Sequence, residues 1–189
     1  MKLLIIGPPG VGKGTQAKRI REYLNIAHLS TGSILRAEIR AFWAVGKEAK
    51  KFIDKGKFVP DKYLTKIVRD EISSAKCKNG YLLDGYPRTI TQANKFEIIL
   101  NDVNHKLDAV IGLRAHEDEL IRRLINRGRD HNRSDDLPEI IRKRQNIYWE
   151  RTAPLLDYYS SKGLLKSIDG LGDIDEITKR IINELKWYD

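Results

Sequence analysis

The residues with the plainest chemistry lie in a glycine-rich segment near the start of the chain, GPPGVGKGTQA (7–17). Gly12 and Lys13 fit the phosphate-binding pattern G-x-x-x-x-G-K-[ST], but Gly14 follows the lysine and Thr15 comes one position late. Glycines let backbone N–H groups approach phosphate oxygens closely, and a lysine at this place reaches the terminal phosphates. The segment therefore predicts a site for the phosphates of a nucleotide.

Other parts of the chain argue against a nucleotide switch of the GTPase type. Such proteins read their base with N-K-x-D, and the nearest match here, NKFE (94–97), ends in glutamate within a predicted helix. The segment DGLG (169–172) fits the switch pattern D-x-x-G, but it lies close to the end of the chain, after the place that a switch would occupy.

Short apolar runs alternate with amphipathic stretches along the chain, and this alternation predicts an α/β fold. Buried strands of this kind form a parallel sheet covered by helices on both faces. Ligands of such sheets bind beyond the carboxyl ends of the strands, where Gly7–Thr15, Asp84–Arg88 and Asp169–Gly172 would meet. The expected strands are 2–6, 26–30, 81–85, 108–113 and 164–169, and the expected helices are 13–24, 33–41, 44–55, 61–75, 90–100, 117–127, 138–159 with a bend near Pro154, and 173–187, with a polar loop at 128–136.

The composition sets limits on the class of protein. A length of 189 residues suits one domain, and 41% hydrophobic with 32% charged residues is typical of a globular chain. The net charge of +9 would suit nucleic acid, an anionic membrane or phosphorylated small molecules as partners. The single cysteine, Cys77, excludes a disulfide framework within the chain, so the cytoplasm is the expected compartment. No apolar run approaches the roughly 18 residues that a membrane span needs.

Five segments, in order along the chain, resemble adenylate kinases. The phosphate loop of that family reads G-x-P-G-x-G-K-G-T, so the late threonine is its normal form. The other four segments are HLSTGSILR (28–36), GKFVPDKYL (56–64), GYLLDGYPRTITQA (80–93) and RSDDLPEIIRKR (133–144). The resemblance implies transfer of a phosphoryl group from Mg-ATP to AMP, giving two ADP. It also implies a single domain, 1–189, with a P-loop kinase core, a nucleoside-monophosphate-binding insertion at 30–59 and a short lid at 126–136.

The resemblance also implies a set of basic residues around the transferred group. Phosphoryl transfer leaves a protein mainly the tasks of positioning and charge neutralisation, and arginine suits them because its fork binds two phosphate oxygens. Arg36 and Arg88 would hold the AMP phosphate, and Arg133 and Arg144 would bridge both nucleotides. The implied catalytic residues are Lys13, Asp84, Arg88, Arg123, Arg133 and Arg144.

Base recognition follows the same resemblance. The Gln92 amide offers a donor and an acceptor to the adenine edge, and Thr31 lies in the matching turn. The implied AMP site is Thr31, Arg36, Lys57, Phe58, Val59, Gly85, Tyr86, Pro87, Arg88, Gln92, Arg133 and Arg144. The implied ATP site is Gly10, Val11, Gly12, Lys13, Gly14, Thr15, Arg123, Arg127 and Gly172.

Metal binding is expected to be limited to the Mg²⁺ that accompanies ATP. Asp84 would hold waters of that ion, which tends to keep them. Many family members carry aspartate after S-T-G, whereas this chain has Ser33, so Asp84 would act more alone. The short lid offers only His131 as a metal ligand, so we expect no structural zinc. Gly128 is expected to give the lid its freedom of movement.

Two alternatives stay open from the sequence. The first is a kinase of UMP or CMP on the same core, against which Thr31 and Gln92 argue. The second is a basic RNA-binding protein that retains a nucleotide-binding fold. No aromatic cluster of the base-stacking kind supports it. We therefore expect ATP, AMP and ADP as partners, no membrane or nucleic acid, and a monomer.

Overall fold

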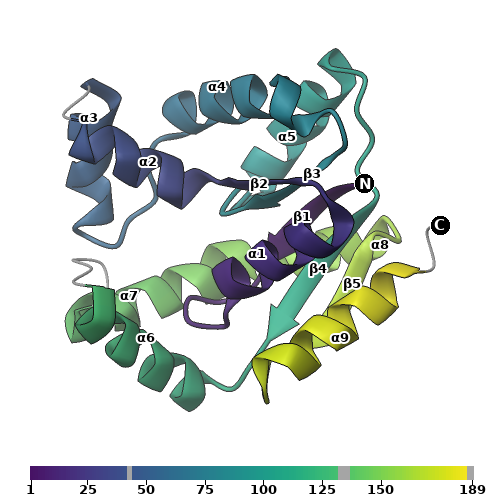
Figure 1. Ribbon diagram of the computed structural model, residues 1–189. Coiled ribbons are helices and arrows are strands. Elements are labelled where there is room, and N and C mark those ends of the chain that lie inside the picture. The colour runs from purple at the N-terminus through teal and green to yellow at the C-terminus, as the bar shows by residue number, and fades with distance from the viewer. Residues whose placement is uncertain (42–43, 132–136, 187–189) are drawn as a thin grey trace.

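The computed structural model describes residues 1–41, 44–131 and 137–186, and a five-stranded parallel sheet forms its centre (Figure 1). The strands are β1 (Lys2–Ile6), β2 (Ala27–Ser30), β3 (Tyr81–Asp84), β4 (Ala109–Arg114) and β5 (Leu165–Asp169), and their spatial order is β2-β3-β1-β4-β5. The register pairs Ile5 with Asp84 and Ile6 with Gly112. The predicted fold class and all five strands are confirmed, each strand within one residue of its expected bounds.

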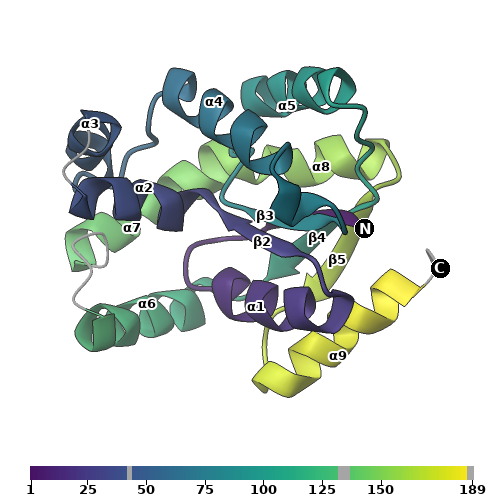
Figure 2. The same ribbon diagram turned by 45° about the horizontal axis from the view of Figure 1, so that its top comes forward.

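Helices cover both faces of the sheet, as Figure 2 shows. Alternate residues of a strand face opposite sides, so Leu3 and Ile5 pack against one layer and Leu4 and Ile6 against the other. The first layer contains α1 (Lys13–Leu24) and α9 (Ile174–Leu185). The second contains α4 (Asp61–Ile72), α5 (Ile90–Asp102) and α8 (Pro154–Ser161). Such two-sided burial explains why the strands read as continuous apolar runs.

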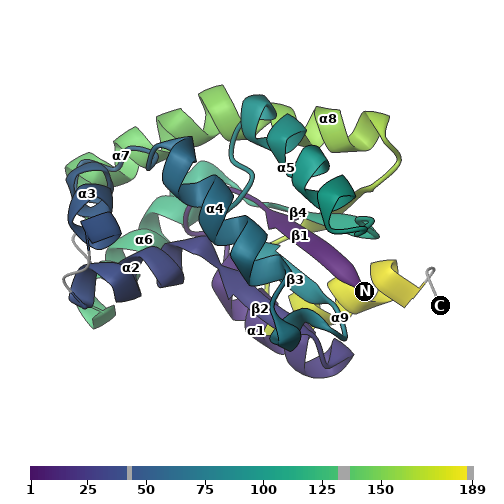
Figure 3. The same cartoon turned by 90° about the horizontal axis from the view of Figure 1, so that it is seen from above.

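Four helices lie beyond the carboxyl ends of the strands (Figures 1 and 3). They are α2 (Thr31–Arg40), α3 (Ala44–Ile53), α6 (Glu117–His131) and α7 (Pro138–Ile147). Helix α2 begins two residues earlier than expected because the Ser30 hydroxyl caps it, accepting from the Ser33 N–H at 3.4 Å.

Two expectations about the helices were wrong. The polar stretch after residue 127 begins as helix, since α6 continues through Gly128 to His131. A glycine inside a helix costs about 1 kcal/mol relative to alanine, which the rest of α6 must offset. The expected long helix after Pro138 is divided instead of bent. The π-helical turn η3 (Tyr148–Thr152) separates α7 from α8, and Pro154 opens α8, where a missing N–H costs little.

Candidate active site

The phosphate loop connects β1 to α1 and leaves open space beside its backbone. Gly12 caps α1 with a φ of 96°, a left-handed conformation that favours glycine. A Cβ atom built on Gly12 or Gly14 would meet no atom within 4 Å. The loop therefore presents the N–H groups of a helix N-terminus to an open cradle, which is an arrangement that binds anions.

The position of this loop at the end of β1 agrees with a role in ligand binding. β1 lies between β3 and β4, so the chain leaves β1 for one side of the sheet and later returns to the other side. Ligands of open parallel sheets bind in the crevice at such a switch point.

Lys13 folds back across the loop. Its Nζ donates to the Gly7 carbonyl at 2.6 Å and to the Pro8 carbonyl at 3.0 Å. Two carbonyl bonds hold the ammonium at the mouth of the cradle, where phosphate oxygens could take their place.

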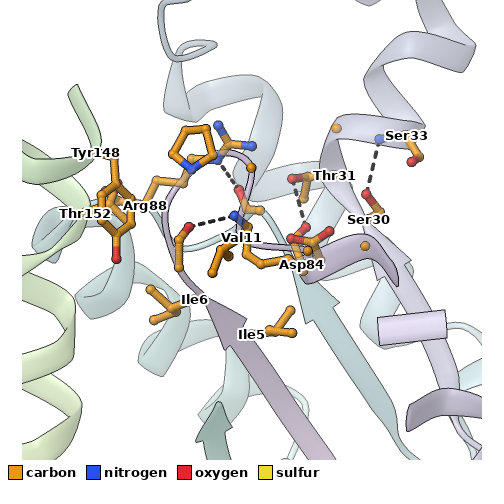
Figure 4. Close-up of a pocket in the computed structure, with 18 of the residues that line it drawn as sticks. Ile5, Ile6, Val11, Ser30, Thr31, Ser33, Asp84, Arg88, Tyr148 and Thr152 are labelled. Carbon is orange, nitrogen blue, oxygen red and sulfur yellow. Dashed lines mark hydrogen bonds between the residues drawn. The ribbon is translucent and has the colours of Figure 1, made fainter. Parts of the chain in front are cut away.

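The turn after β3 lies against the start of α2 (Figure 4). The Thr31 hydroxyl donates to the Asp84 carbonyl at 3.3 Å. Gly85 has a φ of 88°, and a Cβ there would lie 2.6 Å from the Thr31 hydroxyl oxygen. Only glycine allows this approach, which brings β3 and α2 together on one side of the crevice.

Arg88 is held by contacts on several sides. Its Nε donates to the Gly85 carbonyl at 2.7 Å, and its guanidinium lies 5.4 Å from the centre of the Phe58 ring. The Thr152 hydroxyl of η3 donates to the Arg88 carbonyl at 2.9 Å. Orientation of this kind favours the two-oxygen contacts that arginine makes with a phosphate.

These segments enclose one cavity of about 930 Å³, within the size range of ligand sites. Asp84 is the one acidic side chain lining it among the described residues. The basic side chains that line it are Lys13, Lys18, Arg19, Arg36, Lys57, Arg88, Arg123, Arg127 and Arg144. An excess of cations of this size suits a ligand that carries several negative charges.

The charge of Lys13 is disfavoured by its surroundings. Burial, together with the positive charges of Arg88, Arg144 and Arg127, lowers the pKa of the Lys13 ammonium to about 7, although the negative charge of Asp84 opposes this shift. Polyphosphate bound in the cavity would replace this repulsion by attraction.

The structure brings together nearly all the residues that the sequence singled out. Within the described residues, one exception is Tyr86, which is buried in the core beside Phe96 and bonds through its hydroxyl to the Gln92 carbonyl. Arg133 lies outside the described residues. The predicted residues that line the cavity are Gly10, Val11, Gly12, Lys13, Gly14, Thr15, Thr31, Arg36, Lys57, Phe58, Val59, Asp84, Gly85, Pro87, Arg88, Gln92, Arg123, Arg127, Arg144 and Gly172.

Sequence reasoning missed several residues at the site. Lys18 and Arg19 line the cavity from α1, and Tyr148 and Thr152 line it from η3. Lys18 and Arg19 follow Thr15 by three and four positions, the spacing of one helix face, and this spacing was a usable signal. Nothing in the sequence marked the π-helical turn, because its residues resemble those of an ordinary helix.

The surroundings of Asp84 fit a magnesium ion carried by a nucleotide. The nearest described basic nitrogen in an ion pair with this carboxylate is His28 Nε2, 4.0 Å away, and that nitrogen has no hydrogen-bond partner within the described residues. Burial holds the pKa of His28 below its usual range, so this ring does not neutralise Asp84 at neutral pH. A carboxylate beside an open phosphate cradle is a donor that Mg²⁺ accepts, directly or through water.

Metal-ligating clusters and membrane-spanning helices are both absent from the described part of the chain. No group of three or more His, Cys, Asp or Glu side chains there could hold a metal ion by itself. None of the helices described there has the length and apolar character that crossing a membrane requires.

Comparisons with known proteins agree with this geometry. A family model described as adenylate kinase matches residues 5–164. The chain is 47% identical to an adenylate kinase of Bifidobacterium longum over 98% of this chain and 100% of that protein. It is 43% identical to one of a Nocardioides species, over 98% of this chain and 97% of that protein. An adenylate kinase of Leptospira biflexa is 45% identical over 97% of this chain and 99% of its own length. The chain therefore belongs to the adenylate kinase family, a family of phosphotransferases.

Proposed function

We propose that the cavity holds ATP and AMP together and that the chain transfers the terminal phosphoryl group of ATP to AMP, giving two ADP. A phosphate oxygen of AMP forms a bond to the γ-phosphorus, and the bond from that phosphorus to the β-phosphate oxygen breaks. The observation that carries the proposal is that, among the described residues, nine basic side chains and a single carboxylate surround an open phosphate cradle. The family's relatives support adenine nucleotides as the substrates.

ATP would bind on the side of the phosphate loop. The N–H groups of the loop and the α1 N-terminus would hold its phosphates, and Lys13 would exchange its carbonyl partners for phosphate oxygens. Arg123 and Arg127 of α6 would add charge from the opposite side. Gly172 would lie near the base.

AMP would bind between α2, α3 and the turn after β3. Arg36 and Arg88 would hold its phosphate, and Gln92 would read its base beside the backbone of Lys57 and Val59. Arg144, with Arg133, would reach both nucleotides at the transferred group, where added charge stabilises the transition state.

Asp84 and the Thr15 hydroxyl would hold the Mg²⁺ of Mg-ATP, with Asp84 acting through the waters of the ion. The ion supplies neutralisation of the phosphate charges when bound. Ser33 stands where many family members have a second carboxylate. Asp84→Asn should therefore raise the Mg²⁺ concentration needed for the half-maximal rate, and by more than the loss of one of two carboxylates would.

We further propose that 30–59 and 126–136 close over the nucleotides and keep water from taking the phosphoryl group. Cations on α2 and α6 would draw the two segments towards the bound phosphates. The chain would act as a monomer, since one chain supplies both proposed nucleotide sites. Its expected compartment is the cytoplasm.

The test is a phosphoryl-transfer assay with Mg-ATP against AMP, CMP, UMP and GMP, with an acceptor-free control. The proposal expects ADP formation that depends on AMP, with the other monophosphates far behind. Preference for CMP or UMP would retain the phosphotransferase and refute the base assignment. Transfer to none of the four would refute the proposed reaction. Neither a pyrimidine kinase nor an RNA-binding protein is favoured by the comparisons.

A further inference from the structure

The amide of Gln92, the proposed base reader, is held from two sides. Gln92 lies in the first turn of α5, and the residue is 1% exposed although it lines the cavity. Its Oε1 accepts from the Arg88 backbone N–H at 2.7 Å. Its Nε2 donates to Asp61 Oδ1 at 2.8 Å. One N–H and one lone pair of the amide remain for a ligand.

Asp61 comes from a different helix. It is the first residue of α4, which lies beside α5 in all three views (Figures 1–3). Its second oxygen, Oδ2, accepts from Lys95 Nζ at 3.1 Å, and Lys95 follows Gln92 by three residues on α5. The two carboxylate oxygens of Asp61 therefore serve two different donors.

These partners permit only one orientation of the amide. A backbone N–H can only donate, and a carboxylate can only accept. If the Gln92 amide turned over, its NH₂ would face the Arg88 N–H and its oxygen would face the Asp61 carboxylate. Both bonds would be lost, and buried polar groups of like character would oppose each other.

We infer that Asp61 is a specificity-determining positioning residue, which fixes the Gln92 amide so that the site accepts a 6-aminopurine and rejects a 6-oxopurine. This inference rests on the proposed function. Adenine presents an acceptor at N1 and a donor at its amino group. A 6-oxopurine presents a donor at N1 and an acceptor at O6, the reverse pattern, which a fixed amide cannot match. Cytosine shares the pattern of adenine, so its rejection must depend on the size and shape of the site.

The test compares AMP with IMP, which differ only at N1 and the 6-position of the base. The quantity measured is the ratio of kcat/KM for AMP to kcat/KM for IMP, in the full chain with Mg-ATP. In Asp61→Asn, one acceptor oxygen remains for two donors, Gln92 Nε2 and Lys95 Nζ. Whenever Lys95 takes it, the Asn NH₂ faces the Gln92 NH₂ and drives the amide to turn. We expect the ratio to fall about tenfold or more, the effect of roughly one hydrogen bond.

Lys95 supplies matched controls, since it does not line the cavity. Lys95→Met leaves Asp61 to accept from Gln92, so the AMP-to-IMP ratio should stay at the wild-type value. The double variant Asp61→Asn with Lys95→Met returns the single acceptor oxygen to Gln92, so the ratio should recover. A purely structural role of Asp61 would not produce this recovery. Loss of a carboxylate from the first turn of α4 will also lower the Tm slightly, which a ratio of two substrates on one variant does not register.

The outcomes separate the inference from the proposed function. An unchanged ratio in Asp61→Asn, or an equal loss of kcat/KM for both substrates, overturns the inference while the wild-type preference for AMP upholds the function. A ratio that stays low in the double variant also overturns it. A wild type that phosphorylates IMP as well as AMP refutes Gln92 as the base reader, and the inference with it. A wild type that phosphorylates neither refutes the proposed function itself.

Discussion

At the scale of single residues, the environment of Lys13 has a measurable thermodynamic effect. The pKa of this ammonium in the free chain is about 7, because burial and three arginines disfavour its charge. Bound polyphosphate favours the charged form and so raises this pKa. Nucleotide binding and protonation of Lys13 are therefore linked.

We expect ATP binding at pH 8 to take up close to one proton more than binding at pH 6. At pH 8 most free chains carry a neutral Lys13, which becomes charged in the complex, whereas at pH 6 it is charged in both states. Titration calorimetry in buffers with different ionisation heats measures the uptake. Lys13→Met should remove the difference between the two pH values. Equal uptake by the wild type at pH 6 and pH 8 would contradict the assignment.

The residues of the site were predictable mainly where backbone chemistry restricts the residue type. Gly12 and Gly85 need left-handed φ values, and Lys13 and Arg88 must reach phosphates, so short segments of sequence reveal them. Tyr86 stands between two cavity residues and yet faces the core, because the direction of its side chain depends on the packing around Phe96. The bond from Asp61 to Gln92 joins residues 31 positions apart, and no spacing rule gives such a contact.

At the scale of elements, the π-helical turn η3 connects the fold to the AMP side of the cavity. Thr152 in this turn donates to the backbone carbonyl of Arg88 and so holds the segment that carries the proposed phosphate and base contacts. Widened helical turns often occur at functional sites.

We expect Thr152→Val to raise the KM for AMP about three- to tenfold, with a smaller change in the KM for ATP. The valine keeps the shape of the side chain and removes one hydrogen bond. Steady-state kinetics with each nucleotide varied in turn measures the effect. Ser161→Ala, which removes a hydroxyl bond at the end of α8, should leave both KM values unchanged. Equal increases in both KM values would argue against a local role of Thr152.

A second contact between elements serves stability. The Tyr158 hydroxyl of α8 donates to Glu97 Oε1 at 2.8 Å and lies 2.9 Å from Asn94 Oδ1, both on α5, and Lys162 pairs with Glu97 at 2.7 Å. None of these four residues lines the cavity.

Tyr158→Phe should lower the free energy of unfolding by about 1 kcal/mol, the usual effect of a lost hydrogen bond. Phosphotransferase activity should stay within about twofold of the wild type, since no proposed substrate contact changes. Urea unfolding and the standard assay check both. Tyr23→Phe, at an exposed tyrosine of α1, is the matched control and should leave the unfolding free energy nearly unchanged. A loss of activity without a loss of stability would show that the cluster has another role.

The order and type of the elements followed from the sequence, because apolar periodicity and glycine turns are local signals. Their ends were harder to predict. Helix α6 passes through Gly128 and Arg129, which read as loop, since packing along a long helix outweighs one unfavourable residue. The division at η3 depends on an extra residue in one turn, for which composition gives no signal.

At the scale of the whole molecule, the charge is unevenly distributed. The net charge is +9, and the cavity alone gathers nine basic side chains against one acidic one among the described residues. A concave site lined by one sign of charge focuses its field and raises the local concentration of oppositely charged substrates.

We expect kcat/KM for AMP to fall about three- to tenfold between 50 and 300 mM salt, because the screening length falls over this range. The value of kcat at saturating nucleotide should change much less, since capture is then no longer limiting. A salt series with both parameters measured tests this expectation. A kcat that falls as steeply as kcat/KM would indicate that salt acts on the transfer step or on stability instead.

The parallel sheet places the start of β1 on the side of the molecule opposite the cavity. All five strands run in one direction, so the edge where β1 begins lies opposite the cavity, as the N label in Figure 1 shows. There the Met1 carbonyl accepts from the Tyr81 N–H at 3.0 Å, on the opposite side of the molecule from α2, α3, α6 and α7. A fluorophore, affinity handle or surface tether attached through the first residue would therefore leave the entry of nucleotides unobstructed, and the enzyme could be immobilised for single-molecule observation in one defined orientation.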